Sequence, residues 1–238
     1  MTTTGLHDLA LSAAYRVRIA LGLLGACPGR RPGRLTKGCQ RAPEHLARNP
    51  QGLVPVLAID GLELAQSLAI LEYLDETRAA DFLPADAGPN AGANTRRDRH
   101  GDPPVCNLRV ARHAVDASAG AITMAGWMSA FIGPGLAAFE AMLDHPATGR
   151  FCHGDRPGLA DICLVPQLYN ADRWDADLAA MPRIRAIRAA LDALPAVAAA
   201  HPDTATRPRN AQPLVRRNRD SGAPVPDLKA RQNAVASV

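Results

Sequence analysis

The sequence predicts an α/β domain followed by an all-helical domain. The first part has a helical pattern of apolar residues and then two short strand-like segments around a turn. The second part has successive apolar helix patterns and no strand pattern. Between them, residues 86–104 read DAGPNAGANTRRDRHGDPP, which is polar and rich in Gly and Pro, as linkers are. We therefore expect two packed units in this chain of 238 residues.

The first α/β elements lie before residue 35. Residues 12–24 have apolar side chains at intervals of four and predict a helix, with Ser12 as a suitable N-cap. The segment before it, residues 6–11, is short enough for a strand. Residues 26–34 read ACPGRRPGR. Because proline cannot donate a hydrogen bond to a sheet, a central strand is not expected there.

A hairpin and a strong helix follow. Residues 43–47 predict a helical turn. Residues 54–59 and 62–64 predict two strands, joined by an Asp-Gly dipeptide that is typical of hairpin turns. Residues 66–76 then place their leucines on one helical face.

The second part contains four apolar helix patterns, the last of which is interrupted by Pro195. They cover residues 107–118, 125–143, 159–169 and 183–199.

Composition narrows the class of protein. Hydrophobic residues make up 47% of the chain and aromatic residues only 4%, so the core must be aliphatic, which favours helices. No run approaches the ~20 apolar residues of a membrane span, and the N-terminus lacks the pattern of a signal peptide. The five cysteines are odd in number and contain no CxxC pair. We therefore expect reduced thiols in a cytoplasmic protein.

The positive charge of the chain is concentrated at its C-terminus. The net charge is +4, and residues 203–238 hold seven basic and three acidic residues, which leaves residues 1–202 neutral. The tail is rich in Pro, Asn and Arg, and it is predicted to be disordered. No specific nucleic-acid partner is expected. The histidines show no metal-ligand spacing, so no metal is expected either.

Three pairs or runs of residues carry a family resemblance. They are SAAYRVRIAL at residues 12–21, NPQGLVP at 49–55 with QSLAILEYL at 66–74, and FCHGD at 151–155 with LADICLVPQ at 159–167. In this order and at this spacing, the chain resembles the zeta-class glutathione transferases, the class that contains maleylacetoacetate isomerase.

The resemblance implies the architecture of a glutathione transferase, with a thioredoxin-like N-terminal domain and a helical-bundle C-terminal domain. It places the glutathione-binding domain at residues 1–85, an irregular linker at 86–106, the substrate domain at 107–202 and the basic tail at 203–238. Members of the family are homodimers, so a homodimer is expected.

The resemblance also implies a glutathione site. Val54 and Pro55 would form a cis-proline turn that presents the Val54 backbone to a peptide-like ligand. Gln66 and Ser67 open a helix whose N–H groups and dipole suit a carboxylate. Gln40 matches a further family contact. The alternatives are a plain helix cap for Ser67 and a solvated loop residue for Gln40.

Ser12 and Arg16 are the catalytic residues that the resemblance implies. A hydroxyl at a helix start can stabilise a thiolate, and the alternative for Ser12 is an N-cap only. Arg16 and Arg109 would hold substrate carboxylates, because a guanidinium fork fits them. The alternative for Arg16 is an exposed helix arginine. Asn107 and Arg109 match a segment at the edge of the active site and, with Ser12, are assigned to glutathione binding.

Several positions depart from the family pattern. Leu11 stands where the family has the first of two serines, and Pro103 where it often has His or Gln. Residues 26–34 and 88–102 lack the apolar pattern of the strand and helix that the fold needs there. With 25 Arg and two Lys, the chain suggests GC-rich coding, and a shifted reading frame would explain both segments. On that hypothesis, the sheet lacks its edge strand.

Asp161 is expected to have a structural role at the start of the third apolar helix. The family has a Thr-x-x-Asp capping box there, and Gly158 replaces the threonine in this chain.

The implied activity is glutathione-dependent cis–trans isomerisation of a maleyl dicarboxylate such as maleylacetoacetate, a step of aromatic amino-acid catabolism. Close alternatives are a maleylpyruvate isomerase and a general glutathione transferase. A different class also stays open, namely a glutathione transferase-like protein that binds ligands without catalysis.

Overall fold

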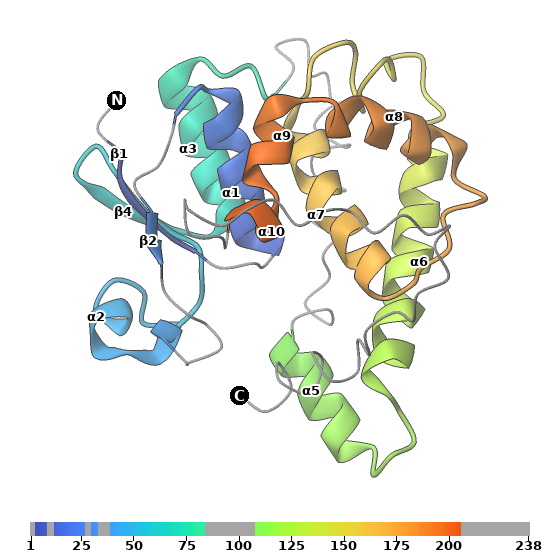
Figure 1. Cartoon of the computed structure of the whole chain (residues 1–238), viewed down its shortest axis with the longest axis horizontal. Helices are drawn as coiled ribbons and strands as arrows, with labels where there is room; N and C mark the ends of the chain where they lie inside the picture. The colour runs from blue at the N-terminus through green and yellow to red at the C-terminus, as the bar shows by residue number, and fades with distance from the viewer. Residues whose placement is uncertain (1–2, 9–11, 27–29, 33–38, 84–107, 206–238) are drawn as a thin grey trace.

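A computed structural model of the chain describes residues 3–8, 12–26, 30–32, 39–83 and 108–205. In Figure 1 a small sheet with its helices lies on the left and the remaining helices lie on the right. The predicted linker lies outside the described residues, as do Leu11, Pro103 and most of the tail.

The N-terminal part has the predicted thioredoxin-like arrangement, a four-stranded sheet in the order β2-β1-β3-β4. β1 pairs with β2 in parallel, and the other two pairs are antiparallel. Its elements are β1 (Thr3–Asp8), α1 (Ser12–Leu23), β2 (Arg30–Pro32), η2 (Cys39–Arg41), α2 (Pro43–Leu46), β3 (Val56–Ile59), β4 (Leu62–Ala65) and α3 (Ser67–Arg78).

The predicted hairpin is confirmed. Asp60 and Gly61 have φ angles of 53° and 79°, which is the left-handed geometry of a two-residue turn that matches strand twist. The turn fixes the register of the strands, so that Val56 lies opposite Ala65.

The edge strand β2 corrects the expectation that the sheet would lack one. Arg30–Pro32 pairs with the end of β1, with Pro32 opposite Asp8. Because β2 is an edge strand, its outer side needs no hydrogen-bond partner in the sheet, and proline is tolerated. β1 also lies earlier than the predicted residues 6–11, at Thr3–Asp8.

The four predicted helices of the second part are confirmed, and the last is split where Pro195 begins a new helix. The elements are α5 (Leu108–Ala117), α6 (Met124–Met142), α7 (Leu159–Arg173), α8 (Pro182–Asp192), α9 (Pro195–Ala200) and α10 (Pro202–Ala205). Among the described helices, none combines the length and apolar character needed to cross a bilayer.

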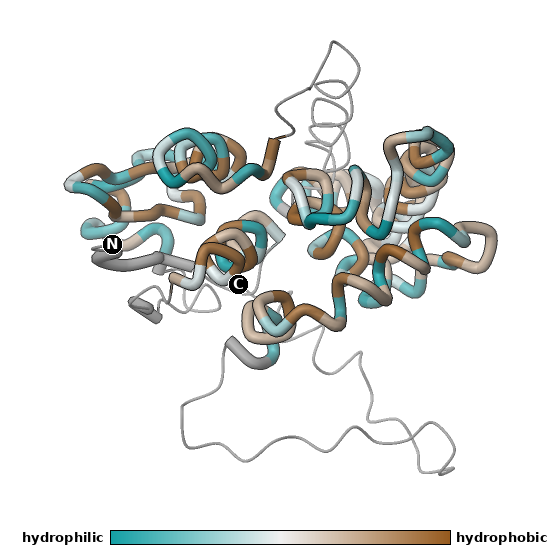
Figure 2. The backbone as a smooth tube through the Cα atoms, turned by 90° about the horizontal axis from the view of Figure 1, so that it is seen from above, coloured by the Kyte–Doolittle hydropathy of each residue, from teal (hydrophilic) through white to brown (hydrophobic). Residues whose placement is uncertain are grey.

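Helix α1 lies at the centre of the molecule. It packs against α3 on one side and against α7 and α9 on the other (Figure 1). Every residue from Ala14 to Leu21 is buried. Hydrophobic positions run through the sheet and the helices of both parts (Figure 2), so a continuous apolar core joins them.

The start of α7 is held by groups far from it in the sequence. Asp161 is buried and accepts hydrogen bonds from the N–H groups of Gly158 at 2.9 Å and Cys152 at 3.0 Å. The Leu159 N–H donates to the carbonyl of Phe82 at 2.9 Å. Burial raises the pKa of the Asp161 carboxyl, while the hydrogen bonds from the amides oppose this shift. Asp161 therefore has the predicted capping role.

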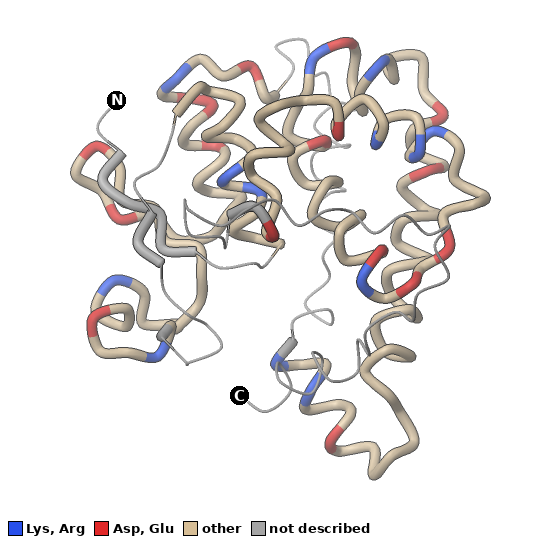
Figure 3. The backbone as a smooth tube through the Cα atoms, in the orientation of Figure 1, with Lys and Arg blue, Asp and Glu red and all other residues tan. Residues whose placement is uncertain are grey.

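The start of α8 is held by a buried carboxylate of α6. Glu140 accepts hydrogen bonds from the backbone N–H groups of Arg183 at 3.0 Å and Ile184 at 2.8 Å. The Arg183 side chain also bonds the exposed Asp144 at 2.6 Å. Elsewhere, basic and acidic residues are interspersed over the described helices (Figure 3).

We expect Glu140→Gln to lower the free energy of unfolding by about 1–3 kcal/mol, because an amide offers only one acceptor oxygen to two buried N–H groups. Urea denaturation followed by circular dichroism measures this change. Asp144→Asn is the matched control, since it weakens the other contact of Arg183 at a side chain that is 75% exposed. It should cost at most about 0.5 kcal/mol. Equal losses in the two variants would contradict the capping role of Glu140.

Candidate ligand site at the start of α3

The loop that enters β3 forms one wall of the candidate site. The Val54–Pro55 peptide is cis, as predicted. Among the described residues, no hydrogen bond uses the Val54 backbone. A ligand with an extended backbone can therefore pair with it in the manner of an added strand.

The hairpin brings this loop to the start of α3. Val56 lies opposite Ala65 in the sheet. The loop residues just before Val56 therefore lie beside Gln66 and Ser67, which come directly after Ala65. Two segments separated by a strand and its return strand thus meet at one edge.

The N-terminus of α3 forms the second wall. The helix begins at Ser67, with Gln66 as its N-cap at a positive φ of 69°. The Gln66 side chain donates to Gln51 Oε1 at 3.0 Å across the site. The first N–H groups of a helix have no partner within the helix, and the helix dipole is positive there. This end of α3 therefore favours an anion.

Arg16 reaches the same place from α1. It is buried, and its Nη1 lies 3.5 Å from the hydroxyl of Ser67. The alternative of an exposed helix arginine is therefore wrong. Its positive charge adds to that of the helix end, which strengthens the preference for an anion.

Ser12 is the first residue of α1 and is half-buried. Its hydroxyl therefore lies at the positive end of that helix, as the prediction requires.

Gln40 lies in η2, beside the loop. Its backbone oxygen would be 3.2 Å from a Cβ placed at Gly52. Its side-chain Oε1 is buried, and no described residue donates a hydrogen bond to it. A buried acceptor of this kind needs a donor, so Gln40 is better suited to a ligand contact than to a solvated loop.

Two predicted residues are not placed in this group. Arg109 is exposed on α5, which packs mainly against α6 and lies apart from α3 in Figure 1. Asn107 lies outside the described residues.

The sequence analysis missed two residues that support the site. His45 Nε2 and Asn49 Nδ2 each donate to the carbonyl of Leu53 at 2.9 Å. Asn49 Oδ1 also accepts from the N–H of Gln51 at 3.2 Å. Both side chains are buried. The signal was present as two polar residues on either side of the short α2, but sequence spacing alone does not show that they turn inward.

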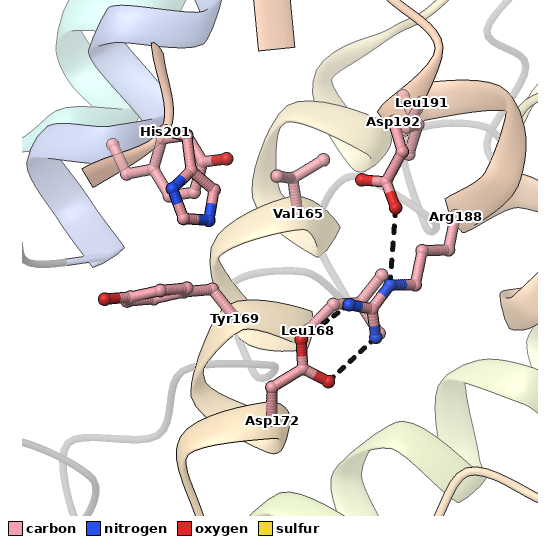
Figure 4. A pocket seen from close by; sticks show the side chains of 9 residues that line it. Val165, Leu168, Tyr169, Asp172, Arg188, Leu191, Asp192 and His201 are labelled. Atoms are coloured by element: carbon pink, nitrogen blue, oxygen red, sulfur yellow. Dashed lines mark hydrogen bonds and ion pairs between the residues drawn. The ribbon is translucent and has the colours of Figure 1, made fainter. Parts of the chain in front are cut away.

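A separate small cavity lies between α1, α7 and α8. It measures about 40 Å³ and is lined by Tyr15, Val165, Leu168, Tyr169, Asp172, Arg188, Leu191, Asp192 and His201 (Figure 4). Burial raises the pKa of the Tyr15 phenol above its usual range. The cavity contains none of the predicted site residues, and its volume suits water rather than a peptide-like ligand.

Within the described residues, no group of three His, Cys, Asp or Glu side chains is placed to hold a metal ion.

Family profiles match both parts of the chain. The profile for the N-terminal domain of glutathione S-transferase matches residues 5–76, and that for its C-terminal domain matches residues 125–200. The chain belongs to the glutathione S-transferase family. The resemblance to the zeta class is confirmed by the relatives below.

Similar proteins of this family include isomerases. Maleylacetoacetate isomerase from Rhizobium meliloti (strain 1021) is 56% identical over 82% of this chain and 93% of its own. A holo structure of a maleylpyruvate isomerase, a bacterial zeta-class enzyme, is 34% identical with a TM-score of 0.79, covering 87% of this chain and 100% of its own. Maleylacetoacetate isomerase from Methylobacterium extorquens AM1, with bound malonate and glutathione, is 34% identical with a TM-score of 0.76, covering 84% and 97%.

We expect Asn49→Ala to lower the free energy of unfolding by about 1–3 kcal/mol, because its buried amide makes two hydrogen bonds within the loop. Thermal and urea denaturation measure the loss. Gln51→Ala, at an exposed side chain of the same loop, is the control and should change stability by less than about 0.5 kcal/mol. An Asn49 variant as stable as this control would show that the loop does not depend on the Asn49 amide.

Proposed function

We propose that this protein is a glutathione-dependent isomerase that converts a cis maleyl dicarboxylate, such as maleylacetoacetate, into its trans isomer. The observation that carries the proposal is the similarity to the Rhizobium meliloti maleylacetoacetate isomerase along most of both chains. The candidate site supports it, because backbone pairing, a helix N-terminus and a buried arginine gather at one edge of the sheet.

The residues of the site fit glutathione as a cofactor. The unpaired backbone of Val54 suits the cysteinyl part of this tripeptide. The start of α3, with Gln66 and Ser67, suits the γ-glutamyl carboxylate. The buried Oε1 of Gln40 offers an acceptor for a donor of the ligand. When bound, glutathione supplies the thiol for reversible nucleophilic addition to the double bond.

We assign the remaining roles as follows. The Ser12 hydroxyl and the positive end of α1 stabilise the thiolate, which raises its concentration at neutral pH. Arg16 contributes positive charge beside Ser67 and holds a carboxylate by its guanidinium. Arg109 and Asn107 contribute at the edge of the site. The chain itself binds, orients and lowers the pKa of the thiol, and these tasks suffice for this reaction.

The substrate is a small dicarboxylate, and maleylpyruvate is a second candidate because a maleylpyruvate isomerase is among the similar structures. We also propose a cytoplasmic homodimer with the domain boundaries given by the sequence, on the basis of the family resemblance. Light scattering after size-exclusion chromatography measures the oligomeric state.

We expect Ser67→Ala to weaken glutathione binding by about five- to tenfold, because a hydroxyl that contacts a charged group contributes about 1–1.5 kcal/mol. Isothermal calorimetry measures the dissociation constant. Thr77→Ala is the matched control, since Thr77 is an exposed hydroxyl at the other end of α3 and bonds only the carbonyl of Tyr73. Unchanged binding in the Ser67 variant would remove Ser67 from the site.

We expect Ser12→Ala to lower isomerase turnover by about tenfold or more, because it removes the hydroxyl that stabilises the thiolate. Turnover is measured with maleylacetoacetate and with maleylpyruvate at saturating glutathione. Unchanged turnover would leave Ser12 as a helix-start residue only. A wild-type protein that binds glutathione but isomerises neither substrate would instead be a non-catalytic member of the family.

A further inference from the structure

The peptide between Leu53 and Val54 is anchored from one side by two buried side chains. The Leu53 carbonyl accepts hydrogen bonds from His45 Nε2 and from Asn49 Nδ2, both at 2.9 Å. A carbonyl oxygen has two lone pairs, so both are used. Few loop carbonyls are held by two side chains in this way, because most side-chain hydrogen bonds go to water or to single backbone groups.

This anchoring sets the direction of the Val54 N–H. The cis bond of this loop is the one between Val54 and Pro55, and the preceding peptide is trans. In a planar trans peptide the C=O and the N–H point in opposite directions. Because the Leu53 carbonyl points toward His45 and Asn49, the Val54 N–H points away from α2. Two donors on the carbonyl also polarise the peptide and strengthen its N–H as a donor.

His45 holds the loop at both of its ends. Its backbone carbonyl accepts from the N–H groups of Arg48 at 3.0 Å and Asn49 at 2.8 Å, while its ring reaches Leu53. Between these points Gly52 adopts a positive φ of 63°, where a Cβ would lie 3.2 Å from the Gln40 backbone oxygen. The loop is therefore closed tightly around one residue.

We propose that His45 is a positioning residue for glutathione. Its Nε2–H fixes the Leu53 carbonyl, and through the peptide plane it aims the Val54 N–H at the cysteinyl part of the ligand. The inference rests on the proposed function, because it concerns how the same site binds glutathione. His45 does not touch the ligand, so its effect is expected on affinity and not on the chemical step.

Two variants that differ by one methylene test this role. Gln places an amide N–H near the position of histidine Nε2, whereas Asn carries the same amide but is too short to reach Leu53. We expect His45→Asn to weaken glutathione binding about fivefold in calorimetry, the effect of one lost hydrogen bond. His45→Gln should stay within about twofold of wild type. Turnover at saturating glutathione should change by less than about twofold in both, so the loss falls on KM.

A readout without ligand separates positioning from general damage. Hydrogen exchange followed by mass spectrometry should show faster exchange of loop residues 49–54 in the Asn variant than in the Gln variant, with α3 and α7 unchanged. His145→Asn is the control, because His145 is an exposed residue after α6 and should alter neither binding nor exchange in the loop. If the Asn variant does not fold, His45→Phe replaces it, since it keeps a ring but has no donor.

The outcomes distinguish the two proposals. Wild-type protein that fails to bind glutathione overturns the proposed function and this inference together. Wild-type binding with equal affinity in the Asn and Gln variants overturns only the role of His45. Weaker binding in Asn, restored in Gln, supports the aiming of the Val54 N–H.

Discussion

The burial of α1 between the two parts is the constraint on which the rest of the structure depends. A helix that is covered all round cannot leave polar groups without partners. Its two buried arginines reach in different directions. Arg16 extends to Ser67 at the start of α3, and Arg18 Nε donates to the carbonyl of Ala200 in α9 at 2.9 Å. Residues two apart lie on nearly opposite faces of a helix, so one arginine serves each part.

Much of this arrangement follows from local sequence patterns. Helices with apolar residues at intervals of three and four fold as predicted, because their faces must be covered by other elements. The Asp-Gly turn fixes the hairpin register, since both residues adopt the left-handed conformation easily. Edge strand β2 could not be predicted in this way. Its three residues, Arg30–Pro32, contain no apolar pattern, and their pairing is determined by the position of β1.

The candidate site shows the same limit. The types of residue that bind a peptide-like anion can be identified from the sequence and the family resemblance, as Val54, Gln66 and Ser67 show. Which of them meet depends on the phase of each helix and on how the chain turns back. Arg16 turns inward to the start of α3, whereas Arg109 lies exposed on another helix. The inward turn of His45 depends on the fold of α2 over the loop, which no local pattern encodes.

The peptide groups of Phe82 connect the last turn of α3 to the first turn of α7. The Phe82 N–H donates to Asp75 Oδ1 at 2.7 Å, and its carbonyl accepts from Leu159 at 2.9 Å. The helix of the second part therefore begins on a backbone group of the first. Cutting the chain between the two parts would leave the start of α7 uncapped and one side of α1 open to water. The two sequence domains thus form a single cooperative folding unit, in which local opening of one part lowers the stability of the other.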